Sequence, residues 1–341
     1  MCEALLYEKL DGRVRCNLCQ RRCLIRPGQK GYCKVRVNQD GTLYTLVYGL
    51  ASSVAVDPIE KKPLFHFYPS SQVFSLGTFG CNFRCIHCQN YTISYEEPGT
   101  ERFISPGQRL SPERTLELTE RYGCGGIAWT YNEPTMWFEY TLDAAKLARE
   151  RGLYTCYITN GYLTSEALDM IGPYLGGYRV DVKGFSDKLY GRLAHIPHWR
   201  GILEVAVRAK ERWNMHVEVV TNVIPTWNDD EEQLRGIARW IKGDLGPYTP
   251  WHVTRFMPYL ELSHLPPTPV STLERAYKIG RDEGLHFVYL GNVPGHKYEN
   301  TICYNCGKTA IRRVGYQTQL VGVSEGGKCK NCGADLNIRG L

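Results

Sequence analysis

From about residue 73 onward, short apolar runs rich in β-branched and aromatic side chains alternate with segments whose apolar residues recur at helical spacing. The runs have the length of strands, and seven stand out: residues 73–79, 126–130, 154–159, 178–182, 216–224, 252–257 and 286–290. Strands separated by helices pair in parallel through right-handed crossovers. The pattern predicts an α/β fold, a partial (β/α)6-type TIM-like barrel of parallel strands, with its chemistry at the strands' carboxyl ends.

Residues typical of helix N-termini precede several of the segments between these runs, which supports their interpretation as helices. Ser111 precedes a proline and is expected to be an N-cap, and Thr164 and Asp229 are similar candidates. Ser271 with Glu274 has the spacing of a capping box. We therefore expect helices to begin at these four places.

The two ends of the chain differ from the middle in composition and in hydrophobic periodicity. Residues 1–70 and 301–341 are rich in glycine and cysteine and show no long helical period. We therefore expect three parts: a Cys-rich N-terminal metal-binding module (1–70), a core barrel (71–300) and a C-terminal zinc-ribbon-like module (301–341).

Length and charge narrow the class of protein. The chain has 341 residues, enough for one large core with small attachments. Its first residues carry acidic side chains and no basic leader, and no apolar run is long enough to span a bilayer, so we expect a soluble, cytoplasmic protein with no membrane partner. The formal charge of +6 counts thiols as neutral, and metal-bound thiolates would lower it to about +1. The basic composition is thus weak support for nucleic-acid binding.

Eleven of the 14 cysteines fall into three tight groups, which indicates metal chemistry before disulfides. Cys124 and Cys156 stand apart among apolar residues and glycines and are expected to be buried small hydrophobes.

The middle cysteine group has the spacing C-x3-C-x2-C and directly follows the first core run. Cys81, Cys85 and Cys88 are three thiolates, which leave one iron of a [4Fe-4S] cluster open. An open iron can chelate the amino and carboxylate groups of S-adenosylmethionine (SAM) and pass an electron to its sulfonium. The alternative is a zinc knuckle made by the three thiolates with His87.

The outer groups each supply four thiolates. Near the C-terminus two C-x2-C pairs, Cys303 with Cys306 and Cys329 with Cys332, favour a tetrahedral zinc site, and the glycine after each pair suits a tight turn. An auxiliary cluster is the alternative. The N-terminal group leaves the choice between zinc and a second cluster open, with a slight preference for a structural metal; its members are Cys16, Cys19, Cys23 and Cys33.

Polar motifs end several of the core runs. Tyr-Asn-Glu-Pro places Asn132 and Glu133 after the second run, and Thr-Asn-Gly places Asn160 after the third. Each is also an ordinary turn. Asp181 and Lys183 end the fourth run on one face, where a salt bridge is the simpler interpretation, and Arg255 ends the sixth.

Together these motifs resemble the radical SAM superfamily over about residues 73–290. Over nearly the whole chain they resemble the AmmeMemoRadiSam-system radical SAM proteins, which are similar to pyruvate formate-lyase activating enzyme. The resemblance implies a [4Fe-4S] cluster on Cys81, Cys85 and Cys88 and cleavage of SAM to a 5′-deoxyadenosyl radical. It implies SAM binding by matching residues at the strand ends, namely Asn132, Glu133, Asn160, Asp181, Lys183 and Arg255.

The sequence departs from the family's pattern in two places. His87 stands where relatives often have an aromatic residue, and Met257 stands where they often have histidine, so no role is carried over to either. The resemblance also implies an external one-electron reductant such as flavodoxin or ferredoxin. It assigns no catalytic side chain beyond the cluster ligands.

Three functions of different classes are compatible with these sequence features. The first, which we favour, is an activating-enzyme-like radical enzyme that abstracts hydrogen from a protein or peptide. The second is radical modification of RNA or a small molecule, for which the stretch Arg312-Arg313-Val314-Gly315-Tyr316 gives modest support. The third is a non-catalytic iron-sulfur or zinc scaffold, which leaves the strand-end motifs unexplained.

Overall fold

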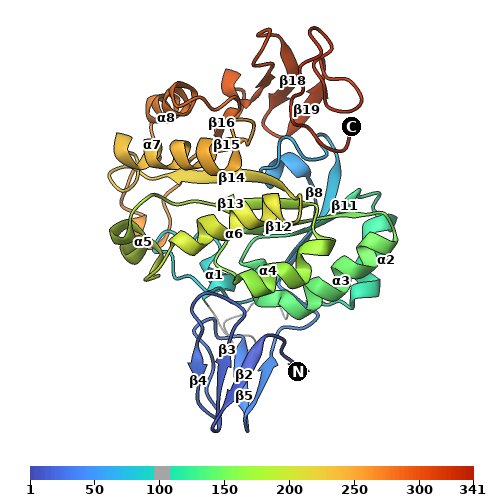
Figure 1. Ribbon diagram of the computed structural model, residues 1–341, viewed down its shortest axis with the longest axis vertical. Helices are drawn as coiled ribbons and strands as arrows, with labels where there is room; N and C mark the ends of the chain where they lie inside the picture. Colours follow the sequence, from blue (N-terminus) through green and yellow to red (C-terminus); the bar gives the residue numbers. More distant parts are fainter. Residues whose placement is uncertain (96–107) are drawn as a thin grey trace. The chain divides into compact units, whose positions relative to one another are not determined.

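The computed structural model describes residues 1–95 and 108–341 (Figure 1). Contacts group the chain into two compact units. Unit 1 comprises Met1–Asp57, Gln72–Tyr178 and His198–Met215, and unit 2 comprises Pro58–Ser71, Arg179–Pro197 and His216–Leu341. The three-part division expected from composition stays a prediction, and each unit is described by itself.

Unit 1 is built on parallel strands in the order β12 (Tyr154–Thr159), β11 (Gly126–Trp129), β9 (Gln72–Gly77), with β8 (Ser53–Pro58) beyond β9. Strand β11 pairs in parallel with both β9 and β12. Every residue of β11 and β12 is buried, as expected for parallel strands covered on both faces. The runs at 73–79, 126–130 and 154–159 are confirmed as strands.

In the described part of unit 1 the longer helices are α2 (Pro112–Arg121), α3 (Phe138–Glu150), α4 (Ser165–Ile171) and α6 (Arg200–Glu211), besides the short α1 (Tyr91–Ser94). Helices α2 and α3 pack against each other (Figure 1). Their buried faces follow from sequence spacing: in α2, for example, Thr115, Leu116 and Thr119 are buried between exposed charged residues.

The N-terminal part of unit 1 consists of short antiparallel strands, drawn in blue in Figure 1. One sheet contains β2 (Tyr7–Leu10), β3 (Arg13–Cys16) and β4 (Leu24–Ile25), and another contains β1 (Cys2–Glu3), β6 (Thr42–Thr45) and β5 (Arg36–Gln39); β7 (Leu50–Ala51) pairs with β10 (Gln108–Arg109). This part is attached to the segment after β12, because Gln20 N–H donates to the carbonyl of Tyr162 at 3.1 Å and Thr164 N–H to that of Leu18 at 3.1 Å.

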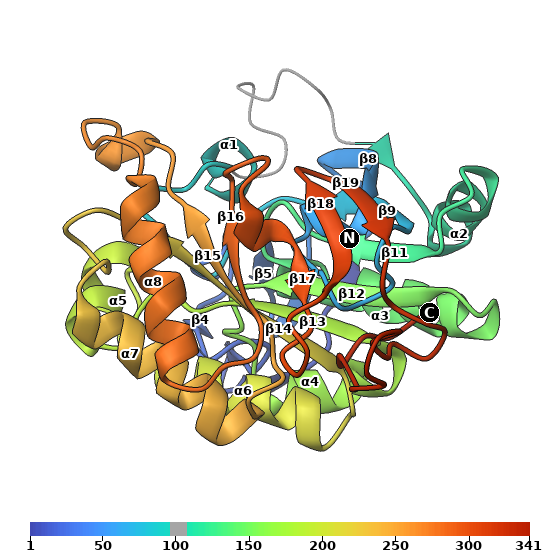
Figure 2. The same ribbon diagram turned by 90° about the horizontal axis from the view of Figure 1, so that it is seen from above.

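Unit 2 carries the other parallel strands, in the order β16 (Val288–Gly291), β15 (Trp251–Arg255), β14 (His216–Val223), with β13 (Gly177–Asp181) beginning in the last residues of unit 1. Strand β15 pairs in parallel with β14 and β16. Its helices are α5 (Asp187–Ala194), α7 (Glu231–Trp240) and α8 (Val270–Asp282); α7 and α8 lie beside each other and α8 packs on β15 and β16 (Figures 1 and 2). The expected α/β fold of parallel strands is confirmed.

The expected helix starts are right at two places and wrong at two. Ser111 and Thr164 accept hydrogen bonds from the backbone N–H groups of Arg114 and Ala167. The cap of α7 is Asp230, since Asp229 instead accepts from Thr226 N–H in the preceding turn. No Ser271 capping box forms, because α8 already begins at Val270.

The C-terminal residues of unit 2 form a small antiparallel sheet of β17 (Thr301–Ile302), β18 (Thr309–Val314) and β19 (Gln317–Leu320). Phe65, Phe287 and Tyr289 pack with its apolar residues in one buried cluster. Arg313 on β18 is 1% exposed and donates to the carbonyl of Phe65 at 2.7 Å. This arginine is therefore a core residue, which removes one cation from the stretch that had suggested RNA binding.

A buried carboxylate organises the interior of unit 2. Glu218 on β14 accepts the backbone N–H of His66 at 2.8 Å and contacts the rings of His216 at 3.0 Å and His252 at 2.6 Å. Burial opposes the charge of Glu218, yet these ring contacts hold its pKa well below its usual range. Burial lowers the pKa of His66 to about 3, so this imidazole is neutral at pH 7.

Across residues 1–95 and 108–341, none of the helices combines the length and apolar character that crossing a bilayer requires.

Candidate metal and cofactor sites

The loop that carries Cys81, Cys85 and Cys88 follows the carboxyl end of β9 in unit 1. Gly80 has φ +80°, and a Cβ there would lie 2.7 Å from the carbonyl oxygen of Cys33. Glycine is therefore required here both for the positive φ and for the close approach of the loop that contains Cys33. This places the loop of the middle cysteine group directly against that of the first.

The three cysteines of this loop are each partly exposed. Burial is the largest cause that raises the pKa of Cys81, followed by the nearby charges of Glu133 and Cys85. Two donors face the Cys81 sulfur: the N–H of Phe83 at 3.4 Å and the side-chain amide of Asn160 at 3.8 Å. Such N–H donors stabilise a metal-bound thiolate, so the residues present fit a cluster with three protein ligands.

Arg84, inside the cysteine motif, fixes the backbone of the loop. Its guanidinium donates to the carbonyls of Cys81 at 2.9 Å, Phe83 at 2.8 Å and Tyr32 at 3.0 Å. The hydroxyl of Tyr95 donates to the carbonyl of Cys85. Sequence reasoning missed Arg84; its position between two ligands was the available signal.

Asn132 positions the start of the same loop. Its side-chain oxygen accepts from Thr78 N–H at 3.0 Å and its amide donates to the carbonyl of Gly80 at 2.7 Å. The side chain thus joins the end of β11 to the segment just before Cys81.

Glu133 is 2% exposed, and both of its carboxylate oxygens have protein partners. Oε1 accepts from the N–H and hydroxyl of Thr135, at 3.1 and 2.5 Å, and from the hydroxyl of Thr159 at 2.7 Å. Oε2 accepts from Asn160 N–H at 2.8 Å. Burial raises the pKa of Glu133 against the opposing effect of these hydrogen bonds. The carboxylate therefore ties the turn after β12 to the turn after β11.

Asn160 completes this arrangement. Its side-chain amide donates to Oδ1 of Asn82 at 2.7 Å as well as facing the Cys81 sulfur, and its own Oδ1 accepts from Tyr162 N–H at 3.0 Å. Unit 1 thus brings the cysteine loop, Asn132, Glu133 and Asn160 into one hydrogen-bonded site.

The other three expected SAM-binding residues belong to unit 2. Asp181 forms an ion pair with Arg179 at 2.8 Å. The backbone N–H of Lys183 donates to the hydroxyl of Tyr190 at 2.9 Å, and Nε of Arg255 donates to the carbonyl of Thr268 at 2.9 Å. Their roles toward SAM stay predictions.

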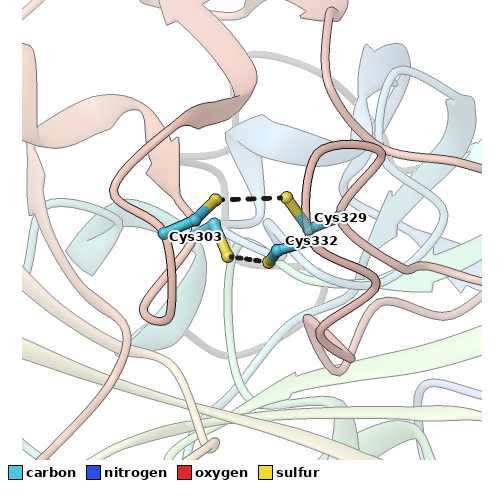
Figure 3. A group of neighbouring side chains, drawn as sticks. Cys303, Cys329 and Cys332 are labelled. Atoms are coloured by element: carbon cyan, nitrogen blue, oxygen red, sulfur yellow. Dashed lines mark hydrogen bonds between the residues drawn. The ribbon is translucent and has the colours of Figure 1, made fainter.

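The C-terminal cysteines of unit 2 form a compact four-sulfur group (Figure 3). Their sulfurs all lie within 4.8 Å of one another; the Cys303–Cys332 separation is 3.6 Å and the Cys306–Cys329 separation 3.7 Å. A hydrogen bond from Asn305 is the largest of the contacts that lower the pKa of Cys332 to about 6. The group can hold a metal ion, and the glycines after each pair have φ near +72° and +73°, as the turns require.

The N-terminal cysteines also meet in space. Cys16, Cys19, Cys23 and Cys33 line one cavity of unit 1 together with Arg36 and Asn82. Arg36 forms a buried ion pair with Glu139 at 2.6 Å. Neither Arg36 nor Asn82 was singled out from the sequence, because nothing in their local pattern marks them. Cys124 and Cys156 are buried apart from the groups, as expected.

Comparison with known proteins agrees with this geometry. The family model of the Radical SAM superfamily matches residues 76–237. The chain is 43% identical over 340 residues to "Uncharacterized protein MJ0808" of Methanocaldococcus jannaschii, covering 99% of each. It is 23% identical over 185 residues to pyruvate formate-lyase 1-activating enzyme of Escherichia coli, covering 54% of this chain and 72% of that protein.

A solved structure of a radical SAM methyltransferase from Sphaerobacter thermophilus shares the fold, with a TM-score of 0.50 and 15% identity over 66% of this chain and 67% of that one. The family match over residues 76–237 agrees with the parallel strands and with the three-cysteine loop at the end of β9. The chain belongs to the radical SAM superfamily.

Proposed function

We propose that this protein is a radical SAM enzyme whose Cys81, Cys85 and Cys88 hold a [4Fe-4S] cluster. The observation that carries the proposal is the three-cysteine loop, with hydrogen-bond donors directed at the Cys81 sulfur from Phe83 and Asn160. When bound, such a cluster supplies the electron that cleaves SAM to methionine and a 5′-deoxyadenosyl radical, which abstracts hydrogen from a substrate.

The chain's own residues hold this site in shape. Asn132 binds the carbonyl of Gly80, and Arg84 binds those of Cys81 and Phe83, so both hold the backbone around Cys81. Because its carboxylate is used by Thr135, Thr159 and Asn160, we assign Glu133 the positioning of Asn160. Asn132, Asn160, Asp181, Lys183 and Arg255 remain the proposed contacts for the amino and carboxylate groups of SAM.

The cluster assignment is tested by electron paramagnetic resonance on the anaerobic, dithionite-reduced protein. We expect a signal whose shape changes when SAM is added, in the wild type and in Cys2→Ala, a control cysteine outside the three groups. Cys85→Ala is expected to lose the SAM-dependent change. The same change in Cys85→Ala would refute the ligand assignment.

For the substrate we propose a protein or peptide. The names of two relatives, a putative glycyl-radical enzyme activating enzyme and pyruvate formate-lyase 1-activating enzyme, describe proteins that act on other enzymes. Burial of Arg313 weakens the RNA alternative.

The substrate class is tested with material from cells of the source organism grown in deuterated medium. Its protein, RNA and small-molecule fractions are each incubated with the enzyme, SAM and reductant. We expect deuterium in 5′-deoxyadenosine from the protein fraction, and its loss after protease treatment. Deuterium transfer from the RNA or small-molecule fraction alone would overturn this assignment.

The C-terminal four-cysteine group is proposed to hold zinc. A tetrahedral Zn–S site with bonds of about 2.3 Å places its sulfurs about 3.8 Å apart. The 3.6 and 3.7 Å separations of the two sulfur pairs agree with that spacing.

A further inference from the structure

The four N-terminal cysteines surround a cavity inside unit 1. Cys16 ends β3, Cys19 and Cys23 lie in the turn that follows, and Cys33 lies in the loop before β5. Cys16 N–H donates to the carbonyl of Cys23 at 2.9 Å, which closes the turn. Cys16, Cys19 and Cys33 are 6–8% exposed. Cys23 is partly exposed. The four cysteines therefore line a largely buried space.

This group is built more loosely than the C-terminal one. Among the described residues, the C-terminal cysteines are the group found close enough together to bind a single metal ion, and their potential ligand atoms all lie within 4.8 Å of one another. A single zinc ion requires that compactness, because all four thiolates bind one atom. A cubane cluster separates them, because each thiolate binds a different iron. The wider N-terminal arrangement favours the cluster.

Two buried donors in the same cavity support this choice. Arg36 is 1% exposed; its Nη2 contacts Glu139 and its Nη1 contacts the carbonyl of Leu5, but its Nε has no partner among the described residues. Asn82 is fully buried, and its Oδ1 is taken by Asn160, while its Nδ2 has no partner in the same residues.

A buried N–H group without an acceptor destabilises the fold, so two in one cavity indicate an acceptor there. Cysteine sulfurs are the acceptors that a zinc site would offer, and neither Nε of Arg36 nor Nδ2 of Asn82 reaches one in the described part of the chain. An iron-sulfur cluster adds inorganic sulfides inside the ring of thiolates, and these accept N–H donors. Net charge does not separate the two, because a four-thiolate zinc site and a four-thiolate [4Fe-4S]²⁺ site both carry about −2.

We propose that Cys16, Cys19, Cys23 and Cys33 hold a second iron-sulfur cluster of the [4Fe-4S] class, with Arg36 and Asn82 donating to its sulfides. Four thiolates leave no iron open, so this cluster stores one electron and does not bind SAM. In the test below the electron comes from dithionite, which is oxidised as the cluster is reduced. The site is independent of the SAM-cleaving function proposed above.

The first test removes the other cluster. A Cys81→Ala/Cys85→Ala/Cys88→Ala variant is purified anaerobically and its iron, sulfide and zinc are measured. We expect about four iron and four sulfide per chain, with a paramagnetic signal after dithionite reduction. Adding Cys19→Ala and Cys33→Ala should remove the iron and sulfide together with the paramagnetic signal. A second zinc per chain in place of the iron, beyond the one proposed for the C-terminal group, or iron that persists after the two added changes, would overturn the proposal.

A second measurement covers the case in which that variant does not fold. Full-length protein with intact Cys81, Cys85 and Cys88 is compared with Cys19→Ser/Cys33→Ser. We expect iron to fall from about eight to about four per chain while the SAM-dependent signal remains. Unchanged iron would contradict the second cluster. Loss of the SAM-dependent signal with no loss of iron would likewise contradict it, because the two substitutions would then have disturbed only the cluster of Cys81, Cys85 and Cys88.

The donors have their own readout. In the variant that lacks the three core cysteines, Asn82→Ala should lower the reduction potential, because a donor to sulfide stabilises the reduced cluster. Asn17→Ala is the matched control, since Asn17 bonds to Glu8 outside the cavity. Equal potentials for the two variants would refute the role of Asn82.

Discussion

Glu133→Gln is the change that tests the site's internal structure most sharply, because it keeps the size of the side chain. Oε1 has three donors and Oε2 has only Asn160 N–H, so the new amide would replace Oε2. Asn160 N–H then loses its acceptor, at a cost of about 1–3 kcal/mol. Glu133→Ala leaves Thr135 N–H without an acceptor as well, so we expect this variant to lose about 2–6 kcal/mol of stability.

The assay is urea unfolding of anaerobically purified protein with equal metal content. Glu150→Gln, an exposed position on α3, is the matched control and should change stability by less than about 0.5 kcal/mol. Because Asn160 also faces the Cys81 sulfur, Glu133→Gln should in addition alter the paramagnetic signal of the reduced cluster. If Glu133→Gln matches Glu150→Gln in stability, the hydrogen-bonded arrangement described for Glu133 is wrong.

Three further predictions concern other parts of the chain. Gly80→Ala should destabilise more than Gly123→Ala, by about 1–3 kcal/mol in urea unfolding, because both have positive φ but only Gly80 meets the Cys33 carbonyl; equal losses would contradict the close approach. The pKa of His66 is lowered from 6.5 to about 3, so below about pH 6.5 the unfolded chain binds a proton at this residue and the folded chain does not, and the free energy of unfolding should fall. His66→Gln should reduce the dependence of that free energy on pH between pH 7 and 5. An unchanged pH dependence would refute the prediction. Cys306→Ala should lower zinc by about one per chain and reduce stability, whereas unchanged zinc by elemental analysis would exclude this ligand.

The strands could be predicted from the sequence because they are buried on both faces and read as uninterrupted apolar runs. The run at 154–159 coincides with β12. Strand β8, whose buried and exposed residues are mixed, gave no comparable run and was not predicted. Asp229 and Asp230 are equal candidates for a cap in sequence, and only the fold of the preceding turn decides between them.

The residues of the candidate site could be identified from the sequence, but their hydrogen-bond partners could not. Cysteine spacing identified the three groups, and the strand-end motifs identified Asn132, Glu133 and Asn160. Hydrogen-bond partners depend on residues far apart in the chain, such as Arg36 and Glu139, which lie 103 positions apart. Such pairs follow from packing, which no local pattern reveals.

The most direct test of the central claim measures 5′-deoxyadenosine formed from SAM by the anaerobic, reduced protein. We expect 5′-deoxyadenosine together with methionine from the wild type and from Cys2→Ala, and none above background from Cys85→Ala. Equal amounts from the wild type and Cys85→Ala, with iron confirmed in the wild type, would contradict the assignment of Cys81, Cys85 and Cys88 as the site of SAM cleavage.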